Sequence, residues 1–367
     1  MGRIWMTMVG ASVGLVLALT ACGANSSSSG ADGSAGGMRV GVILPETATS
    51  ARYERFDKPL LDEALRAEGL DPDIQNAQGD VQKFSTLADG MINSGVRVLV
   101  IDAPNSEVGA AVTRKARAAG IPTIDYDRLN LGGSSDYYVS FDNVHVGALQ
   151  GEGLVQGVGD KPGANIIEIQ GAPTDNNVTQ LYQGQQSVLK SKYDSGAYQL
   201  VGSRRIPEWN NQQGGVTFEQ FLTANGGTVD GVLAANDGMA GAVITVLRKN
   251  GLAGKVPVTG QDATPEALRA ILRGDQYMTV FKAIADEANA TATLAAALAR
   301  GDRTAADALA TETSTDPTAN RTVKSVLLTP ILITKDNVKQ VVDAGGVTAS
   351  EICVADTAAV CEQLGIR

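Results

Sequence analysis

Histidine, cysteine and clustered positive charge are scarce in this sequence. Its 367 residues include one histidine, His145, and three cysteines, none of them in a CxxC motif. Structural zinc sites are built from closely spaced ligand pairs such as CxxC, so one histidine and three scattered cysteines disfavour this class, and we expect neither a metal nor another cofactor. Thirty Lys and Arg oppose 40 Asp and Glu, for a net charge of −10. Since no run of five or more basic residues occurs, a nucleic acid partner is disfavoured.

Aromatic residues are also few, at 4%, whereas 43% of the residues are hydrophobic and 19% are charged. This composition is typical of a soluble globular body and excludes a disordered chain or a protein with many membrane spans. The length predicts two domains of about 150 residues each.

The first residues have the character of an export signal. A short positive start precedes the uncharged apolar run from Ile4 to Leu19, which is brief for a membrane span. Residues 19–22, Leu-Thr-Ala-Cys, resemble the lipobox of bacterial lipoproteins. We therefore predict a signal peptide over 1–21, a lipid anchor on Cys22 that holds the protein at the outer face of the cell membrane, and a flexible Gly/Ser tether over 22–37.

The two remaining cysteines, Cys353 and Cys361, lie near the C-terminus. In an exported chain that lacks other metal-ligating residues nearby, a disulfide is favoured over a metal site.

From Met38 onward, short β-branched runs alternate with amphipathic stretches, which predicts parallel sheets covered by helices. Predicted strands are Arg39–Leu44, Asp73–Ala77, Val96–Ile101, Pro122–Tyr126, Tyr137–Phe141, Asn165–Gln170, Gln199–Ser203, Gly231–Ala235, Val256–Thr259, Met278–Phe281 and Ser325–Ile333. Predicted helices are Arg55–Ala67, Gln82–Asn93, Glu107–Ala119, Asn143–Val158, Asn176–Lys190, Gly238–Asn250, Pro265–Leu272 and Ala283–Arg300. These strands are too many for one doubly wound sheet. We therefore expect two similar α/β lobes that divide near residues 140–143.

Polar residues follow many of the predicted strands, at the edge where open α/β sheets bind ligands. They are Asp127 and Arg128, Asp175 and Asn177, Asn236 and Asp237, Gln261 and Asp262, and Lys282. Paired carboxylates, amides and cations of this kind suit the adjacent hydroxyl groups of a polyol. The alternative is that each Asp or Asn is only a helix N-cap.

Two aromatic segments also lie at strand ends. Trp209 is flanked by polar residues, although a lone tryptophan is more often part of a core. The segment Arg52-Tyr53-Glu54-Arg55-Phe56 places cations and aromatics together after the first strand, with a solvated helix face as the alternative.

Seven motifs occur in order along the body. They are Tyr53-Glu54-Arg55-Phe56, Tyr126-Asp127-Arg128, Ser140-Phe141-Asp142-Asn143, Asp175-Asn176-Asn177, Ala235-Asn236-Asp237-Gly238, Gly260-Gln261-Asp262-Ala263 and Thr279-Val280-Phe281-Lys282. Together they resemble the periplasmic sugar-binding proteins of ABC transporters, most closely the xylose-binding subgroup. The resemblance implies the type I periplasmic binding protein fold: two doubly wound parallel-sheet lobes joined by a three-strand hinge. We expect the lobes to comprise 38–141 with 281–324, and 142–280 with 325–367.

The resemblance also implies a site and a function. The family's sugar ligands fall on Arg55, Asp127, Arg128, Asp175, Asn177, Asn236, Asp262 and Lys282, with stacking aromatics on Phe56 and Trp209. One departure is that the family commonly has tryptophan where Phe56 stands. We expect a monomer that is not an enzyme. It would bind a monosaccharide, with D-xylose as the first candidate, and deliver it to the membrane subunits of an ABC permease.

Other functions remain as alternatives. Asp127, Asp175 and Asp262 could serve a glycoside hydrolase, although neighbouring cations are expected to lower carboxylate pKa values below what a general acid needs. A sugar-sensing receptor is a further alternative. A Ser-His-Asp hydrolase or a nucleotide enzyme is disfavoured, because the body has no GxSxG, GxGxxG or GxxxxGK[ST] motif. A transcriptional repressor shares the two-lobed fold, but those proteins begin with a helix-turn-helix rather than an export signal.

Overall fold

The computed structural model describes residues 37–47, 50 and 52–367. The predicted signal peptide, Cys22 and the tether up to residue 36 lie outside the described residues. Within the described part, no helix combines the length and the apolar character that a membrane crossing requires.

The first lobe is built on a seven-stranded sheet of order β10-β11-β5-β4-β3-β1-β2. Its strands are β1 (Met38–Leu44), β2 (Leu70–Asn76), β3 (Val98–Ile101), β4 (Thr123–Tyr126), β5 (Tyr137–Phe141), β10 (Glu312–Asp316) and β11 (Arg321–Leu328). All neighbours are parallel except the β10–β11 hairpin at the edge. A parallel sheet needs cover on both faces, which explains the nearly continuous apolar character of β1 and β3.

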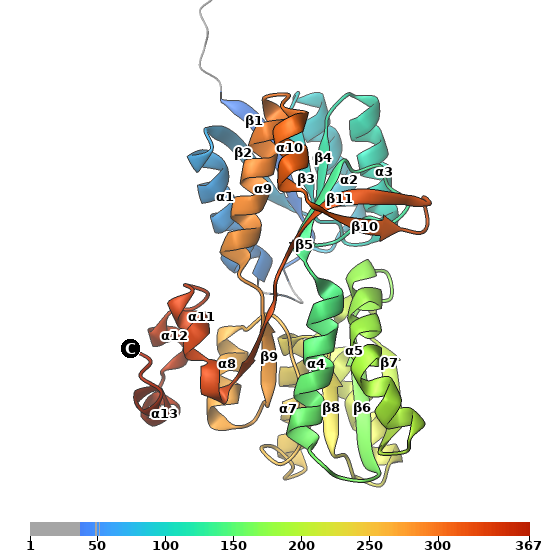
Figure 1. Cartoon of the computed structure of the whole chain (residues 1–367), viewed down its shortest axis with the longest axis vertical. Coiled ribbons are helices and arrows are strands. Elements are labelled where there is room, and N and C mark those ends of the chain that lie inside the picture. The colour runs from blue at the N-terminus through green and yellow to red at the C-terminus, as the bar shows by residue number, and fades with distance from the viewer. Residues whose placement is uncertain (1–36, 48–49, 51) are drawn as a thin grey trace, which may run out of the picture. The chain divides into compact units, whose positions relative to one another are not determined.

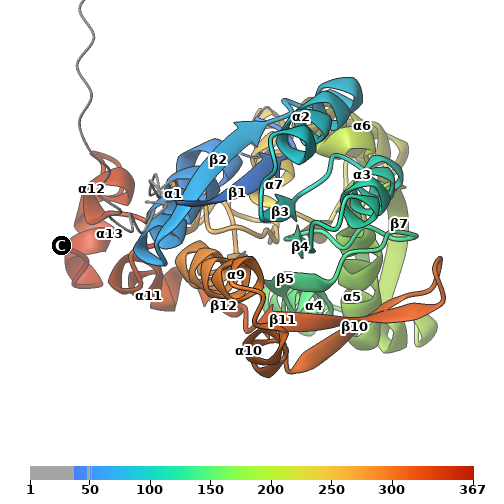
Figure 2. The same ribbon diagram turned by 90° about the horizontal axis from the view of Figure 1, so that it is seen from above.

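Helices cover both faces of this sheet (Figure 2). They are α1 (Lys58–Ala67), α2 (Val81–Asn93), α3 (Ser106–Ala118), α9 (Ile284–Ala299) and α10 (Arg303–Leu309). Side chains of β1 alternate between the two layers. Val40, Val42 and Leu44 pack with α1 and α9, whereas Ile43 packs with Phe84 of α2 and its neighbours. The two-residue period of the strand thus joins two separate apolar cores.

The second lobe repeats this construction with fewer strands (Figure 1). Strands β6 (Ala164–Gln170), β7 (Tyr198–Arg205) and β8 (Gly231–Ala234) form a parallel sheet of order β7-β6-β8, and β9 (Met278–Phe281) pairs with β12 (Ile331–Thr334) in antiparallel fashion. The helices are α4 (Asn143–Val158), α5 (Asn176–Asp194), α6 (Asn211–Ala224), α7 (Asp237–Lys249) and α8 (Pro265–Arg273).

The chain passes between the lobes three times, from β5 to α4, from β9 to α9 and from β11 to β12. The fold predicted from the sequence, two parallel-sheet α/β lobes with three connections, is confirmed. Of the expected lobe boundaries, the one between residues 141 and 142 lies directly after β5. The one between residues 280 and 281 lies just before the last residue of β9. The boundary at 324/325 lies inside β11, whose pairing with β5 continues to Leu328.

Two predicted strands differ from the structure. Val256–Thr259 forms only one bridge, between Val258 and Val232, because the run is short and Pro257 has no N–H to donate. The predicted strand Ser325–Ile333 is divided between β11 and β12, since Pro330 interrupts it. The hairpin strand β10 and helix α10 occupy a stretch in which the sequence analysis identified no element.

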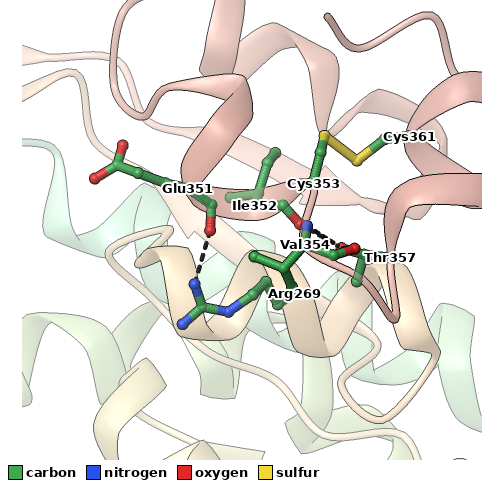
Figure 3. The surroundings of a disulfide bond; sticks show 7 residues. All are labelled: Arg269, Glu351, Ile352, Cys353, Val354, Thr357 and Cys361. Carbon is green, nitrogen blue, oxygen red and sulfur yellow. Dashed lines mark hydrogen bonds between the residues drawn. A yellow bond between two sulfur atoms is a disulfide. The ribbon is translucent and has the colours of Figure 1, made fainter.

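The C-terminal segment packs on the second lobe. It contains η3 (Lys335–Asn337), α11 (Lys339–Asp343), α12 (Ala349–Ile352) and α13 (Ala358–Gln363). Cys353 and Cys361 are joined by a disulfide in the structure, with Cα atoms 5.8 Å apart (Figure 3). Arg269 Nη1 of α8 donates to the carbonyl of Glu351 at 2.7 Å, which ties α12 to the lobe.

Loss of this disulfide is expected to lower the free energy of unfolding by about 2.5 kcal/mol, because the unfolded chain regains the entropy of an open loop. The measurement is urea unfolding of Cys353→Ser and of the wild type with and without reductant. Reductant should reproduce the effect in the wild type and leave the variant unchanged. An equal midpoint for the wild type and the variant would contradict this expectation.

Candidate functional site

A small cavity lies between the two lobes, at the carboxyl ends of their parallel strands. Its lining residues are Glu46, Ser50, Arg52, Tyr53, Asp127, Arg128, Asp175, Asn177, Trp209, Asn236, Gln261, Asp262 and Lys282. The free volume inside is about 30 Å³, so a ligand of sugar size enters only when the lobes move apart. The predicted ligands Asp127, Arg128, Asp175, Asn177, Trp209, Asn236, Asp262 and Lys282 are all brought together here.

The structure does not bring Arg55 and Phe56 to the cavity. They belong to the π-helical turn η1 (Tyr53–Asp57), in which Tyr53 and Asp57 face inward and Arg55 points outward to an ion pair with Glu351. Phe56 borders a separate pocket beside Phe281. The cavity positions belong to Arg52 and Tyr53 instead. The sequence holds two Arg–aromatic pairs three residues apart, and only the rotation of the helical turn selects between them.

Arg52 is the centre of a buried charge cluster in the first lobe. Its guanidinium contacts Asp57 at 2.6 Å, Asp127 at 2.9 Å and Glu287 of α9 at 2.8 Å, and its side chain is 3% exposed. The hydroxyl of Tyr126 donates to Asp57 at 2.6 Å. One buried cation thus serves three carboxylates, only one of which, Asp127, lines the cavity.

The excess of carboxyl groups over cations in this cluster favours a proton bound to one of the carboxyl groups. Burial raises the pKa of Glu287 to about 8, and the charges of Asp127 and Asp57 add to the rise, against the attraction of Arg52. Burial alone would also raise the pKa of Asp127, but the positive charges of Arg52, Lys282 and Arg128 hold it below its ordinary range. At neutral pH, Glu287 therefore holds the proton and Asp127 is ionised.

The proton on Glu287 makes stability depend on pH. Because its pKa is higher in the folded than in the unfolded protein, its contribution is complete below about pH 4.5 and is lost as pH rises through about 8. We expect Glu287→Gln, which mimics the protonated carboxyl, to remove a fall of up to about 1.4 kcal/mol per pH unit over this window.

Urea unfolding from pH 5 to pH 9 measures this effect as the difference between wild type and variant, so other buried carboxyls cancel. The neighbouring exposed position provides the control, Asp286→Asn. Parallel curves for wild type and Glu287→Gln would show that Glu287 is ionised throughout.

Arg128 forms a second cation centre and reaches across the lobes. Its Nε lies 3.2 Å from Asp175 of the second lobe and 3.6 Å from Asp102, and its Nη2 donates to the hydroxyl of Tyr53 at 2.9 Å. Asp127 lies between the two cation centres, since Tyr53 also donates to its Oδ2 at 3.1 Å. The paired charges hold each other in place.

The ligands of the second lobe are also helix caps. Asp175 accepts from the N–H of Asn177 at 2.9 Å to begin α5, and Asn236 accepts from the N–H of Met239 at 2.9 Å to begin α7. The capping interpretation is therefore confirmed, and both residues also line the cavity, so capping does not prevent the predicted ligand role. Asn177 Nδ2 donates to the carbonyl of Asp127 at 2.9 Å, a direct contact between the lobes.

Asp262 and Lys282 complete the wall. Lys282 Nζ lies 3.2 Å from Asp262 and 3.8 Å from Asp127. Asp262 has a φ of 99°, a rare conformation for a residue with a side chain. Asp237 lies behind it, outside the cavity lining, and its carboxylate accepts from Thr264 N and Thr279 Oγ1. Asp237 thus positions the loop that carries Asp262.

Trp209 is held from two sides. Its Nε1 donates to Asp175 Oδ2 at 3.1 Å. Its ring lies against Gly171, where an added Cβ would come within 2.3 Å of a ring carbon. Both Glu208 and Trp209 have left-handed backbone angles, with φ of 56° and 54°. Strain of this kind persists only where the surrounding structure imposes it, and it concentrates at functional sites.

Several buried polar atoms around the cavity lack a hydrogen-bond partner within the described protein. They include Gln261 Oε1 and both carboxylate oxygens of Asp102. Arg128 Nε and Asp262 Oδ1 form no hydrogen bond either, although each lies 3.2 Å from an oppositely charged group, Asp175 and Lys282 respectively. Buried donors and acceptors are costly when unpaired. A hydroxyl both donates and accepts, so a ligand with several hydroxyls would satisfy a mixed set of this kind.

The argument from carboxylate pKa values against a hydrolase holds only in part. Cations lower the pKa of Asp127, but burial raises the pKa of Asp175 above its ordinary value despite Arg128. For Asp175, the hydrogen bonds are more informative than the pKa, because both carboxylate oxygens accept from N–H groups, one from Asn177 and the other from Trp209. Among the described residues, no group of three His, Cys, Asp or Glu side chains is arranged to hold a metal ion.

Fold and site together define a two-lobed protein that encloses a small polar ligand at the strand ends of both lobes. The chain belongs to the periplasmic binding protein domain family, which matches residues 40–303. The resemblance found in the sequence is therefore confirmed.

Relatives and solved structures agree with this assignment. The chain is 37% identical to the D-xylose-binding periplasmic protein of Escherichia coli K12 over 314 residues, covering 84% of this chain and 90% of that protein. It is 33% identical to the multiple sugar-binding periplasmic receptor ChvE of Rhizobium radiobacter, with 84% and 90% covered. An ABC transporter solute-binding protein from Clostridium phytofermentans with bound β-D-glucose has a TM-score of 0.79, at 28% identity, with 86% and 99% covered.

Proposed function

We propose that this protein binds a monosaccharide between its lobes, with D-xylose or a related aldose as the first candidate, and delivers it to the membrane subunits of an ABC permease. One observation carries the proposal: a cavity lined from both lobes by paired charges, with buried polar atoms at and beside it that form no hydrogen bond within the described protein. The sugars named for the relatives support the choice of ligand class.

In this function, the sugar replaces contacts that now join the lobes. Arg128 to Asp175 and Asn177 to Asp127 connect the lobes directly. Sugar hydroxyls inserted between these partners would be held by groups from both sides, so the ligand favours the closed form. Binding requires no covalent step, and we propose that the protein is a monomer without catalytic activity.

The residues proposed to contact the sugar are those that line the cavity. Arg52, Asp127, Arg128, Asp175, Asn177, Asn236, Asp262 and Lys282 would serve as hydrogen-bond partners, and Tyr53 and Trp209 as aromatic walls. Arg55 is not included, because it points outward to Glu351, and Phe56 is not included, because it borders a neighbouring pocket that shares only Asp262 and Lys282 with the cavity.

The placement of the protein in the cell rests on the N-terminal sequence. We propose that it works outside the cytoplasmic membrane, attached by a lipid on Cys22. The tether over 22–37 would hold the folded body at a distance from the membrane surface. Mass spectrometry of the N-terminal peptide from the native producer tests this, since lipidation would leave Cys22 as a modified first residue.

A receptor role is a second candidate, favoured by the 33% identity to a relative named as a sugar-binding receptor. In that case, the sugar-bound protein would contact a membrane sensor in addition to the permease.

Calorimetric titration with a panel of aldopentoses and aldohexoses tests the main proposal. We expect one sugar, D-xylose first, to bind without being consumed and to change the fluorescence of Trp209, whose ring borders the cavity. If no sugar of the panel binds, or if a glycoside is hydrolysed, the proposed function is wrong.

A further inference from the structure

A groove borders the cavity on its outer side and differs from it in size and chemistry. Its volume is about 500 Å³, within the range of small-molecule sites. Loops after β2 and β3 form one wall, including Gln78 and Asn105, and the segments before α5 and around η2 (Pro207–Trp209) form the other. The groove therefore lies between the two lobes, as the cavity does.

The groove and the cavity share part of their walls. Glu46, Arg128 and Trp209 line both spaces, so the two abut at these three side chains. A substituent on a ligand in the cavity that extends past Arg128 and Trp209 would enter the groove directly.

The lining of the groove is mixed. Pro104, Pro173 and Pro207 supply apolar surface, and Val81 adds to it. Amide groups lie among them. The oxygens of Asn105 and Asn210 already cap α3 and α6, accepting from the N–H groups of residues 108 and 213, so each amide keeps its NH2 as a donor for a ligand. Apolar patches beside polar donors suit a sugar ring, which has C–H faces and hydroxyl edges.

The backbone at the boundary is strained. Glu208 and Trp209 are adjacent and both left-handed, although neither is a glycine. Such a conformation is costly for a residue other than glycine, and it is typical of places where a side chain must be held for a ligand. This backbone conformation places Trp209 between the cavity and the groove, and Glu208 at the groove.

We propose that this groove is a second sugar subsite, which accepts a ring linked through a glycosidic bond to the ring in the cavity. The protein then binds disaccharides as well as monosaccharides. This inference rests on the proposed function, because the first ring must occupy the cavity.

The test is calorimetry with D-xylose, D-glucose, xylobiose, cellobiose and maltose. We expect at least one disaccharide to bind with a Kd within tenfold of its monosaccharide. Val81→Trp from the first lobe and Thr174→Trp from the second should fill the groove, weaken that disaccharide at least tenfold and leave the monosaccharide within twofold. Gln82→Trp, on the exposed side of the same helix as Val81, is the matched control and should change neither.

The outcomes separate the two proposals. If a monosaccharide binds but every disaccharide is more than tenfold weaker, the subsite is refuted and the proposed function stands. Disaccharide binding that both groove variants leave unchanged would also refute the subsite. If neither kind of sugar binds, the proposed function fails and the subsite fails with it.

Discussion

Replacing Arg52 with glutamine is expected to lower the free energy of unfolding by about 3–5 kcal/mol, the usual cost of removing one partner from a buried ion pair. Among the described residues, Arg52 is the one cation that forms an ion pair with Asp57, and it also holds Asp127 and Glu287. Without it, Asp127 keeps Lys282 at 3.8 Å and Arg128 at 3.9 Å, but the buried side chains of Asp57 and Glu287 are left without their ion-pair partner.

Urea unfolding at pH 7 measures this loss. Arg55→Gln is the matched control, because Arg55 lies on the same turn but its ion pair with Glu351 is partly exposed, and such pairs contribute about 1 kcal/mol or less. Arg52→Lys retains the charge and should give an intermediate result. A loss below about 1 kcal/mol for Arg52→Gln would show that the cluster is held by other groups.

Replacing Arg128 with alanine is expected to weaken sugar binding by about 2–5 kcal/mol, which is at least about 30-fold in Kd. The variant removes a donor from the cavity and leaves Asp102 and Asp175 without their nearest cation. It also breaks one of the direct links between the lobes, Arg128 to Asp175, so closure around the ligand loses one of its contacts.

Titration with D-xylose, or with whichever aldose binds best, measures the effect on protein that circular dichroism shows to be folded. Arg303→Ala is the control, since Arg303 forms an exposed pair with Asp136 far from the cavity lining. Arg128→Lys keeps the charge without the planar guanidinium and should recover part of the affinity. A change below about threefold for Arg128→Ala would remove this residue from the proposed site.

The two variants separate stability from binding within one network. Arg52 is surrounded by groups of the first lobe, whereas Arg128 reaches a carboxylate of the second. We therefore expect Arg52→Gln to act mainly on unfolding and Arg128→Ala mainly on ligand affinity.

Much of the site was predictable because it lies where strands end. Asp175 and Asn236 follow β6 and β8, and their caps begin α5 and α7. In a parallel sheet these positions share one edge, so order along the chain is enough to predict proximity in space. The same position explains why a residue can cap a helix and also line the cavity.

The first segment of the site was harder to predict. Arg52-Tyr53 and Arg55-Phe56 have the same chemistry, and their spacing places them on different faces of one turn. The partners that select Arg52 are Asp57, Asp127 and Glu287, and the last is 235 residues away in sequence. No local pattern indicates which pair turns inward.

The sequence by itself determined the alternation of strands and helices, the two-lobed fold, the family and most of the cavity lining. These depend on short-range periodicity and on residues at strand ends, which are read along the chain. Sequence patterns could not predict that the Arg52 side chain points into the cavity, that Glu287 holds a proton, where β11 ends, or that a groove lies beside Trp209. Each depends on burial or on contacts between distant segments, and these exist only once the lobes are packed.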